Sequence, residues 1–279
     1  MKLTADKAHF WRSDKWPGFE LMRAHWVRHS FSKHFHDCYT IGINDGGAGN
    51  FDCRHKKQDA WPGRLNLIEP GETHTGGASS ECGWLYRDFY ISVECMHDLA
   101  QRVNVTQIPE FCSATVHDPE LAHEFREVFV AMTTMPATHL EQDYLLVKAI
   151  RRLCVRHGCQ QPAHVRVSKE REAISRIRDY IHAHFAEEIT ISRLASLTGW
   201  STFHLIRAFH EATGIPPHAY QNTLRVAQAQ EQLRNGESIA DAAVSCGFYD
   251  QSHMNRLFRR MLGATPGQYR RTAAISSKT

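Results

Sequence analysis

The chain has 279 residues, of which 42% are hydrophobic, 10% aromatic and 23% charged. This composition excludes a disordered, collagen-like or small disulfide-stapled protein, and the length suits two domains better than one. The formal net charge is only +3, but residues 166–279 carry 15 Lys and Arg against 10 Asp and Glu, so the cationic excess lies in the C-terminal part.

The first 19 residues mix charged and aromatic side chains and lack the apolar segment of a secretory signal. Apolar runs elsewhere are only a few residues long, whereas a membrane span needs about 20. We therefore expect a cytoplasmic protein without a membrane partner. In that compartment, eight cysteines without a Cys-x-x-Cys pair predict reduced and mostly buried thiols.

Short strands separated by tight turns are predicted from about residue 20 to residue 92. Segments of strand length lie between successive turn signals and favour a closed antiparallel barrel or sandwich. The predicted strands include Tyr39–Asn44, Gly49–Arg54 and Leu65–Glu69, and the turn signals are Gly46-Gly47, Pro62-Gly63, Pro70-Gly71 and Gly76-Gly77.

Helical spacing predicts an antiparallel helix pair over residues 118–158, interrupted at Thr133–His139. Each helix carries an apolar stripe, which either the barrel or a second copy of the chain must cover. We therefore expect a dimerisation segment here, with packing on the barrel as the alternative. The two stripes are Leu121, Phe125, Val128 and Met132, then Leu146, Ile150 and Leu153. Residues 159–169 show no hydrophobic periodicity and are predicted to be a linker. The N-terminal domain is therefore expected to comprise residues 1–158.

Everything from residue 170 to residue 279 is predicted to be helical, and a pattern of seven positions occurs there twice. The first helix is marked by Ile174, Ile177, Ile181 and Phe185. The two copies are offset by 48 and then 49 residues, which indicates one supersecondary unit used twice. They read Ala195-x3-Gly199-x7-Arg207-x-Phe209-x4-Gly214-x2-Pro217-x2-Tyr220 and Ala243-x3-Gly247-x8-Arg256-x-Phe258-x4-Gly263-x2-Pro266-x2-Tyr269.

Each copy has the features of a helix-turn-helix, over about residues 190–213 and 238–262. A small Ala lets two helices cross closely, and a Gly four residues later can adopt the left-handed conformation of the turn. Ser201 and Asp250 can cap the second helices, on which Leu205 and Met254 would pack inward. A helical hairpin that binds nothing explains one copy, but it does not explain an Arg at the same place on both second helices.

A single helix is predicted between the two units, from Pro217 to Arg234, with Asn235-Gly236 at its end. Its 18 residues span about 27 Å, close to the roughly 34 Å between successive major grooves on one face of B-DNA. One chain is therefore predicted to reach two successive grooves of an operator.

Residues 171–271 resemble the double helix-turn-helix domain of AraC/XylS-type bacterial transcription regulators. The resemblance is carried by Gly247-Phe248, Arg256-x-Phe258 and Gly263-x-Thr265-Pro266-x2-Tyr269-Arg270, with departures at His210 and at Ser252-His253-Met254. It implies that the two recognition helices contact base edges of double-stranded DNA. The residues so implied are Phe203, Ile206 and Arg207 on the first helix, and Gln251, Ser252, Asn255 and Arg256 on the second.

Residues 20–92 resemble the cupin barrel that such regulators often carry as a sensor. His34-x-His36 and Pro70-Gly71-Glu72-Thr73-His74 are similar to its two motifs. The implied pocket for a small-molecule effector includes His34, His36 and His74, with Trp84 and Tyr86 on one face of a later strand and Arg87 on the other. Three imidazoles can bind a metal, but Thr40 stands where metal-binding cupins usually place a carboxylate. The histidines therefore also fit a metal-free pocket or a structural role, and no cofactor is predicted.

The predicted fold is α+β and multidomain, with an N-terminal cupin-like β-barrel and helix pair and a C-terminal all-α double helix-turn-helix. The predicted function is a ligand-responsive, sequence-specific, dimeric DNA-binding regulator rather than an enzyme. The alternatives are a metal-dependent cupin enzyme with a helical appendage, or a protein-interaction scaffold. The identity of the effector, the operator sequence and the direction of regulation stay open.

Overall fold

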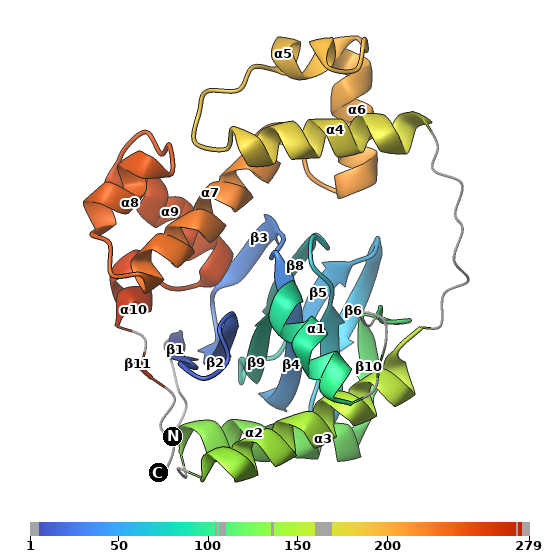
Figure 1. The fold of residues 1–279 in the computed structure, drawn as a ribbon, viewed down its shortest axis with the longest axis vertical. Coiled ribbons are helices and arrows are strands. Elements are labelled where there is room, and N and C mark those ends of the chain that lie inside the picture. The colour runs from blue at the N-terminus through green and yellow to red at the C-terminus, as the bar shows by residue number, and fades with distance from the viewer. Residues whose placement is uncertain are drawn as a thin grey trace. The chain divides into compact units, whose positions relative to one another are not determined.

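A computed structural model describes residues 6–103, 105, 110–134, 137–159, 169–271 and 273–274 (Figure 1). The chain divides into two compact units. The first comprises residues 1–30, 36–161 and 272–279, and the second comprises residues 31–35 and 162–271. The predicted linker lies almost wholly outside the described residues.

The described strands form two β-sheets, and they lie in the first unit except for residues 31–34 of β3. A seven-stranded sheet has the strand order β10-β7-β4-β9-β2-β1-β11, and a four-stranded sheet has the order β3-β8-β5-β6. The larger sheet contains β1 (Lys7–Arg12), β2 (Phe19–Trp26), β4 (Cys38–Gly47), β7 (Arg64–Ile68), β9 (Trp84–Ser92), β10 (Thr115–His117) and β11 (Ala273–Ala274). The smaller sheet contains β3 (Ser30–His34), β5 (Gly49–Cys53), β6 (Lys56–Ala60) and β8 (His74–Ala78).

The strand pairs β1–β2, β2–β9, β4–β7, β4–β9, β5–β6, β5–β8 and β7–β10 are antiparallel, whereas β11 pairs with β1 in parallel. This confirms the antiparallel β fold that the short strands and turns predict. The turn expected at Gly76-Gly77 is wrong, because both glycines lie inside β8. A Cβ at Gly77 would make an ordinary van der Waals contact with Ser30, 3.4 Å from its Oγ, so this position in the strand does not require a glycine.

Three helices accompany the sheets: α1 (Val93–Arg102), α2 (Pro119–Thr133) and α3 (His139–His157). The apolar stripes predicted on α2 and α3 are buried in one core with alternate residues of the sheet, such as Ile41, Phe89 and Ile91. The barrel therefore covers these stripes, which was the alternative to their use in dimerisation. A different face of α3 stays exposed, with Leu140, Tyr144 and Val155 showing 79%, 66% and 70% of their surface.

Asp118 joins the start of α2 to the end of α3. Its carboxylate caps α2 by accepting from Leu121 N and also contacts Arg156 and His157, with His157 Nε2 3.0 Å away. Burial alone would raise the pKa of Asp118, but these hydrogen bonds outweigh burial and hold the pKa below its ordinary value of 3.8. The carboxylate is thus a charged clamp between the two helices.

One pair of cysteines departs from the expectation of reduced thiols. Cys112 and Cys159 form a disulfide, whereas Cys38, Cys53, Cys82, Cys95, Cys154 and Cys246 keep their thiols outside any disulfide. A bridge between residues so far apart in sequence depends on the fold and has no local signal.

The second unit contains seven described helices. The predicted helix from Pro217 to Arg234 is α7, with the same bounds. The others are α4 (Lys169–Ala183), α5 (Ile191–Ser196), α6 (Thr202–Thr213), α8 (Ile239–Ser245), α9 (Gln251–Leu262) and α10 (Pro266–Arg270). Within the part of the chain that the structure describes, a search for helices of membrane-spanning length and hydropathy finds none.

Candidate functional site

Two helix-turn-helix units, α5–α6 and α8–α9, supply the candidate DNA-binding surface (Figure 1). Their turns contain Gly199 and Gly247 with φ of +70° and +74°, the left-handed conformation that the repeat predicts. Ser201 Oγ accepts from His204 N at 3.2 Å, and Asp250 Oδ1 accepts from His253 N at 2.6 Å. Both second helices are therefore capped as expected.

A buried tyrosine packs against the inward face of each recognition helix. Tyr220 lies edge-on to Phe209 of α6, with 5.4 Å between ring centroids, and its hydroxyl accepts from Arg178 Nε at 3.0 Å. Tyr269 repeats this contact with Phe258 of α9 at 5.5 Å, and its hydroxyl accepts from an arginine of α7 at 3.0 Å. The repeated Phe and Tyr are thus structural, and they fix which face of each helix points outward.

The outward faces carry the residues implied as DNA contacts. Phe203 and Ile206 are exposed to 76% and 42%, which is unusual for large apolar side chains and suits contact with thymine methyl groups. Arg207 and Arg256 are exposed at equivalent positions, and Arg207 makes only a 3.8 Å contact with Glu211. Of the other implied residues, Gln251 and Ser252 are exposed and Asn255 is half-buried.

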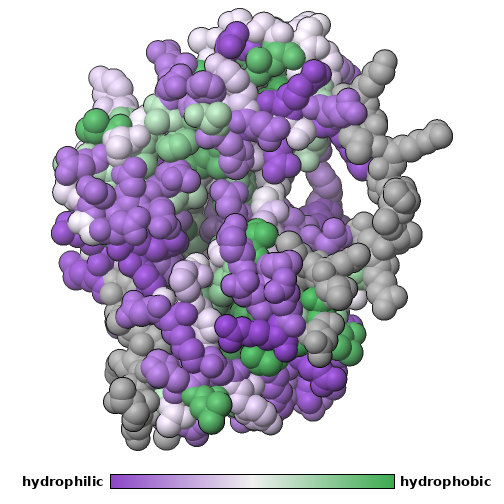
Figure 2. Space-filling model, viewed as in Figure 1, coloured by the Kyte–Doolittle hydropathy of each residue, from purple (hydrophilic) through white to green (hydrophobic). Residues whose placement is uncertain are grey.

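Of the two recognition helices, α9 carries more positive charge than α6. Besides Arg256 it exposes Arg259 and Arg260, and it contains no acidic residue. Figure 2 shows a largely hydrophilic surface over the region of α8 and α9. Sequence reasoning missed Tyr249, which precedes the α9 cap and is 92% exposed. The sequence could have indicated this residue, because the turn between Gly247 and Asp250 is one residue longer than the turn between Gly199 and Ser201.

The three predicted histidines come together. One nitrogen of each lies within 4.8 Å of the others, and the His36 and His74 ring centroids are 5.1 Å apart. His34 and His74 are buried, and their Nδ1 atoms contact the carbonyl oxygens of Ser32 and Glu72. Burial lowers the pKa of His74, which favours a neutral imidazole. Such a set can ligate a cation or hydrogen-bond an effector.

Trp84 and Tyr86 share one face of β9, as predicted, and Arg87 points to the other. Both aromatic residues are buried in contact, with ring centroids 4.4 Å apart. Trp84 Nε1 donates to Asn44 Oδ1 at 2.8 Å, and Tyr86 accepts from Trp26 Nε1 at 2.8 Å. Their polar atoms are therefore already engaged within the protein.

On the opposite face of the larger sheet, Asp45 is an ionic centre for Arg87 and Arg126. The Asp45 side chain is 9% exposed, its Oδ1 lies 2.9 Å from Arg126 Nε, and its Oδ2 pairs with Arg87. This links β4 and β9 to α2, which is a structural role.

Sequence reasoning missed a buried carboxyl on the same face as Trp84 and Tyr86. Asp88 is 7% exposed and lies opposite Gly42 in the strand register, and it accepts from Tyr90 Oη at 3.2 Å. Burial raises its pKa from 3.8 to about 7, although the Tyr90 hydrogen bond opposes this. Thr40, two residues from Gly42 on β4, has a buried Oγ1 that finds no hydrogen-bond partner among the residues that the structure describes. The sequence could have indicated this position, because side chains along residues 84–92 alternate between the two faces of the strand and Asp88 therefore shares a face with Trp84.

Two family models match the chain. Residues 17–150 match the AraC-like ligand binding domain, and residues 194–272 match a helix-turn-helix domain. The first range contains the histidines and the buried carboxyl, and the second contains both recognition helices.

One known protein is similar over most of the chain, and a second is similar over about a third of it. YbfI of Bacillus subtilis, named an uncharacterized HTH-type transcriptional regulator, is 29% identical over 84% of this chain and 85% of its own. The uncharacterized HTH-type regulator SACOL0084 of Staphylococcus aureus is 35% identical over 36% of this chain, which corresponds to 13% of its own length.

Among solved structures, unsaturated fatty acid-bound ToxT of Vibrio cholerae has a TM-score of 0.57 and 10% identity, with coverage of 100% of this chain and 99% of ToxT. This likeness concerns the fold. The two family models, taken with the relative that covers most of the chain, show an AraC-like ligand-binding domain followed by a helix-turn-helix DNA-binding domain, which is the organisation of an AraC-type transcription regulator.

Proposed function

We propose that this regulator reads an operator with α6 and α9, one in each of two successive major grooves. The observation that carries the proposal is the exposure of Arg207 and Arg256 at equivalent positions, while a buried Phe–Tyr pair holds the rear of each helix. Arg can pair with guanine, Gln or Asn with adenine, and Phe or Ile with a thymine methyl group. The proposed contacts are Phe203, Ile206, Arg207, Gln251, Ser252, Asn255 and Arg256.

The weak contact of Arg207 with Glu211 does not compete with this role. At 3.8 Å, with both side chains more than half exposed, the pair contributes little, so DNA can displace it. The 18 residues of α7 set the spacing, because they span about 27 Å and both units pack on this helix.

Selection of operator sequences from random DNA, followed by gel-shift titration, tests this function. Arg207→Ala and Arg256→Ala should each weaken specific binding by about 1–3 kcal/mol. Arg207→Lys and Arg256→Lys are matched controls that keep the charge but lose the bidentate fork, so they should lose base preference at one position while nonspecific affinity persists. Unchanged operator affinity in both alanine variants would contradict the proposal.

The effector is proposed to bind at the histidine cluster, with the buried aromatic pair of β9 as further candidate contacts. Imidazole, indole and phenol groups suit a small polar or aromatic molecule. A metabolite panel screened by thermal shift should give hits that His74→Ala removes and His123→Ala keeps, since His123 lies exposed on α2. A hit that binds equally to both variants would place the effector elsewhere. The set for this site is His34, His36, His74, Trp84 and Tyr86.

We also infer that the protein acts in the cytoplasm and lacks catalysis of its own. The competing cupin-enzyme hypothesis requires a metal on the three imidazoles. Metal analysis of the purified full chain separates the two. Near-stoichiometric iron or zinc that His34→Ala abolishes would favour the enzyme, and its absence would favour a metal-free sensor.

The exposed face of α3 supports a homodimer. Leu140, Tyr144 and Val155 lie on it, and a groove there is lined by Tyr144, Val147, Val155 and the cationic Lys148, Arg151, Arg152 and Arg156. Figure 2 shows hydrophobic patches over the α2–α3 layer. Light scattering should report a dimer that Tyr144→Glu dissociates, whereas Glu127→Gln on exposed α2 surface should not. A monomer at every concentration would end the dimer proposal.

A further inference from the structure

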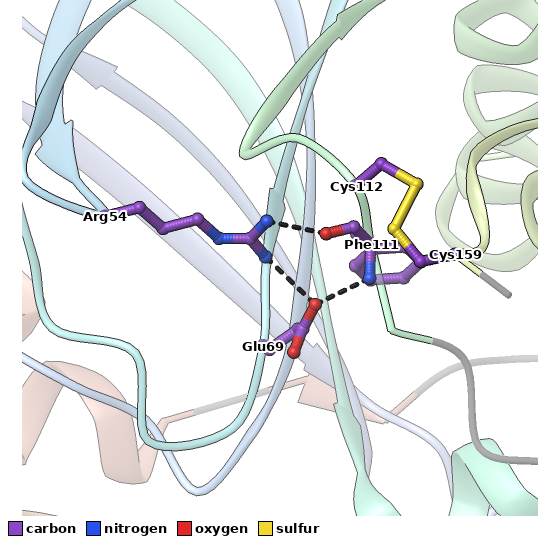
Figure 3. The surroundings of a disulfide bond; sticks show 5 residues. All are labelled: Arg54, Glu69, Phe111, Cys112 and Cys159. Carbon is purple, nitrogen blue, oxygen red and sulfur yellow. Dashed lines mark hydrogen bonds and ion pairs between the residues drawn. A yellow bond between two sulfur atoms is a disulfide. The ribbon is translucent and has the colours of Figure 1, made fainter. Parts of the chain in front are cut away.

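Cys112 and Cys159 lie where two chain segments meet at the edge of the first unit (Figure 3). Phe111 and Gly158 form an antiparallel bridge. Cys159 N donates to Glu110 O at 2.7 Å, and Cys112 N donates to His157 O at 3.4 Å. These backbone contacts place the two Cα atoms 5.3 Å apart, within the span that a disulfide needs. The segments are therefore aligned by contacts that do not depend on the sulfur bond.

The Cys112 side of this junction is anchored to the sheets. Phe111 is buried, its backbone N donates to Glu69 Oε1 at 2.6 Å, and its carbonyl oxygen accepts from Arg54 Nη1 at 2.6 Å. Arg54 Nη2 also donates to Glu69 at 2.9 Å, which closes a ring of contacts beside the cysteine (Figure 3). The backbone next to Cys112 is therefore held in place by the sheets.

The Cys159 side is the end of the helical layer. Cys159 follows α3 within two residues, and the next described residue is Lys169 at the start of α4 in the second unit. A bond between the two cysteines therefore fixes the point from which the chain continues to the DNA-binding unit. Without that bond, the backbone contacts and the Asp118 clamp on the end of α3 still hold the preceding residues, but Cys159 itself is no longer tied covalently to the sheet domain.

Reagents in solution can reach the pair. Cys112 is exposed and Cys159 is half-buried, unlike the buried Cys53, Cys95 and Cys246. Disulfides in cytoplasmic proteins are typically transient and catalytic or redox-sensing rather than structural. An exposed cysteine with a second cysteine aligned beside it has the arrangement of an oxidisable thiol and its resolving partner.

We propose that Cys112 and Cys159 form a reversible oxidation site for hydroperoxides, and that its state alters operator affinity. The Cys112 thiolate attacks the peroxide and breaks its O–O bond, which forms a sulfenic acid; the leaving oxygen takes up a proton and departs as an alcohol, or as water when the oxidant is hydrogen peroxide. The Cys159 thiol then attacks that sulfur, so the disulfide forms and the sulfenic oxygen leaves as water. Two thiols thereby give two electrons to one peroxide, and a dithiol reductant returns them by exchange.

The test treats the full chain with hydrogen peroxide and then with a dithiol, and maps disulfides by mass spectrometry after alkylation. A Cys112–Cys159 bridge that appears and disappears, with Tm higher by roughly 5–10 °C in the oxidised form, is expected. Cys112→Ser and Cys159→Ser should abolish both effects. Cys82→Ser, which removes another exposed cysteine, should keep them. Failure of the bridge to form, or mixed pairing with Cys82, overturns the proposal.

Operator affinity is the second readout, and it rests on the proposed DNA-binding function. Oxidised and reduced wild-type protein should differ in operator Kd by about fivefold or more, and both serine variants should show no difference. Equal affinities in the two states overturn the regulatory step. Loss of operator binding in both states, with the bridge still forming and dissolving, refutes the DNA-binding proposal and leaves the oxidation site supported.

Discussion

Replacement of the buried carboxyl in the first unit, Asp88→Asn, gives the sharpest test of the structure. Asp88 is 7% exposed, and burial raises its pKa from 3.8 to about 7. The folded protein therefore keeps a proton that the unfolded chain loses above about pH 4. Because the folded state binds more protons in this window, its stability falls as pH rises from about 4 to 7 and levels off above.

The magnitude follows from the two pKa values. Between pH 5 and pH 8 the wild-type first unit should lose about 2–3 kcal/mol relative to the variant, at about 1.4 kcal/mol per pKa unit. Asn keeps an oxygen that accepts from Tyr90, so the variant should fold and should be the more stable protein at pH 8.

Urea unfolding at pH 5 and pH 8, followed by tryptophan fluorescence, measures this difference. Five of the six tryptophans lie before residue 85, so the signal reports mainly on the first unit. Asp59→Asn, at an exposed position on β6, is the matched control and should track the wild type. Parallel pH profiles for wild type and Asp88→Asn would refute the assignment of a buried, protonated carboxyl.

Three further predictions concern stability. Asp45→Ala should cost about 3 kcal/mol in urea unfolding because it leaves two arginines without their carboxylate, and a loss below about 1 kcal/mol would contradict this. Gly247→Ala should lower Tm more than Gly199→Ala: both have positive φ, but a Cβ at Gly247 would lie 2.0 Å from Ala186 O, whereas Gly199 has nothing within 4 Å. Equal shifts would refute that argument. The depressed pKa of Asp118 means that its stabilisation is present above about pH 4 and disappears as the pH falls further, so Asp118→Asn should flatten acid unfolding.

The sequence predicted the second unit well because its signals are local. Helix caps, left-handed glycines and the alternation of buried and exposed helical positions all act within a few residues, and the unit occurs twice. The bounds of α7 and the burial of Leu205 and Met254 follow from such signals.

The first unit was predicted less completely because its important contacts are non-local. The depth of Asp88 depends on its register against Gly42 in another strand, and the Cys112–Cys159 bridge depends on segments 47 residues apart. The α2 and α3 stripes were correctly identified as apolar, but only the fold decides that the sheet covers them. Helix α1 and the strands outside residues 20–92 were not individually predicted.

The shared α7 helix has a consequence for operator architecture. Since each residue of an α-helix adds about 100° of rotation and 1.5 Å of rise, a one-residue insertion in its middle would turn one reading helix far out of phase with the other. In the proposed two-groove complex, the length of α7 sets both the spacing and the angular phase of the two DNA sub-sites, so insertion or deletion of half a helical turn of DNA between them should be as damaging as loss of one sub-site.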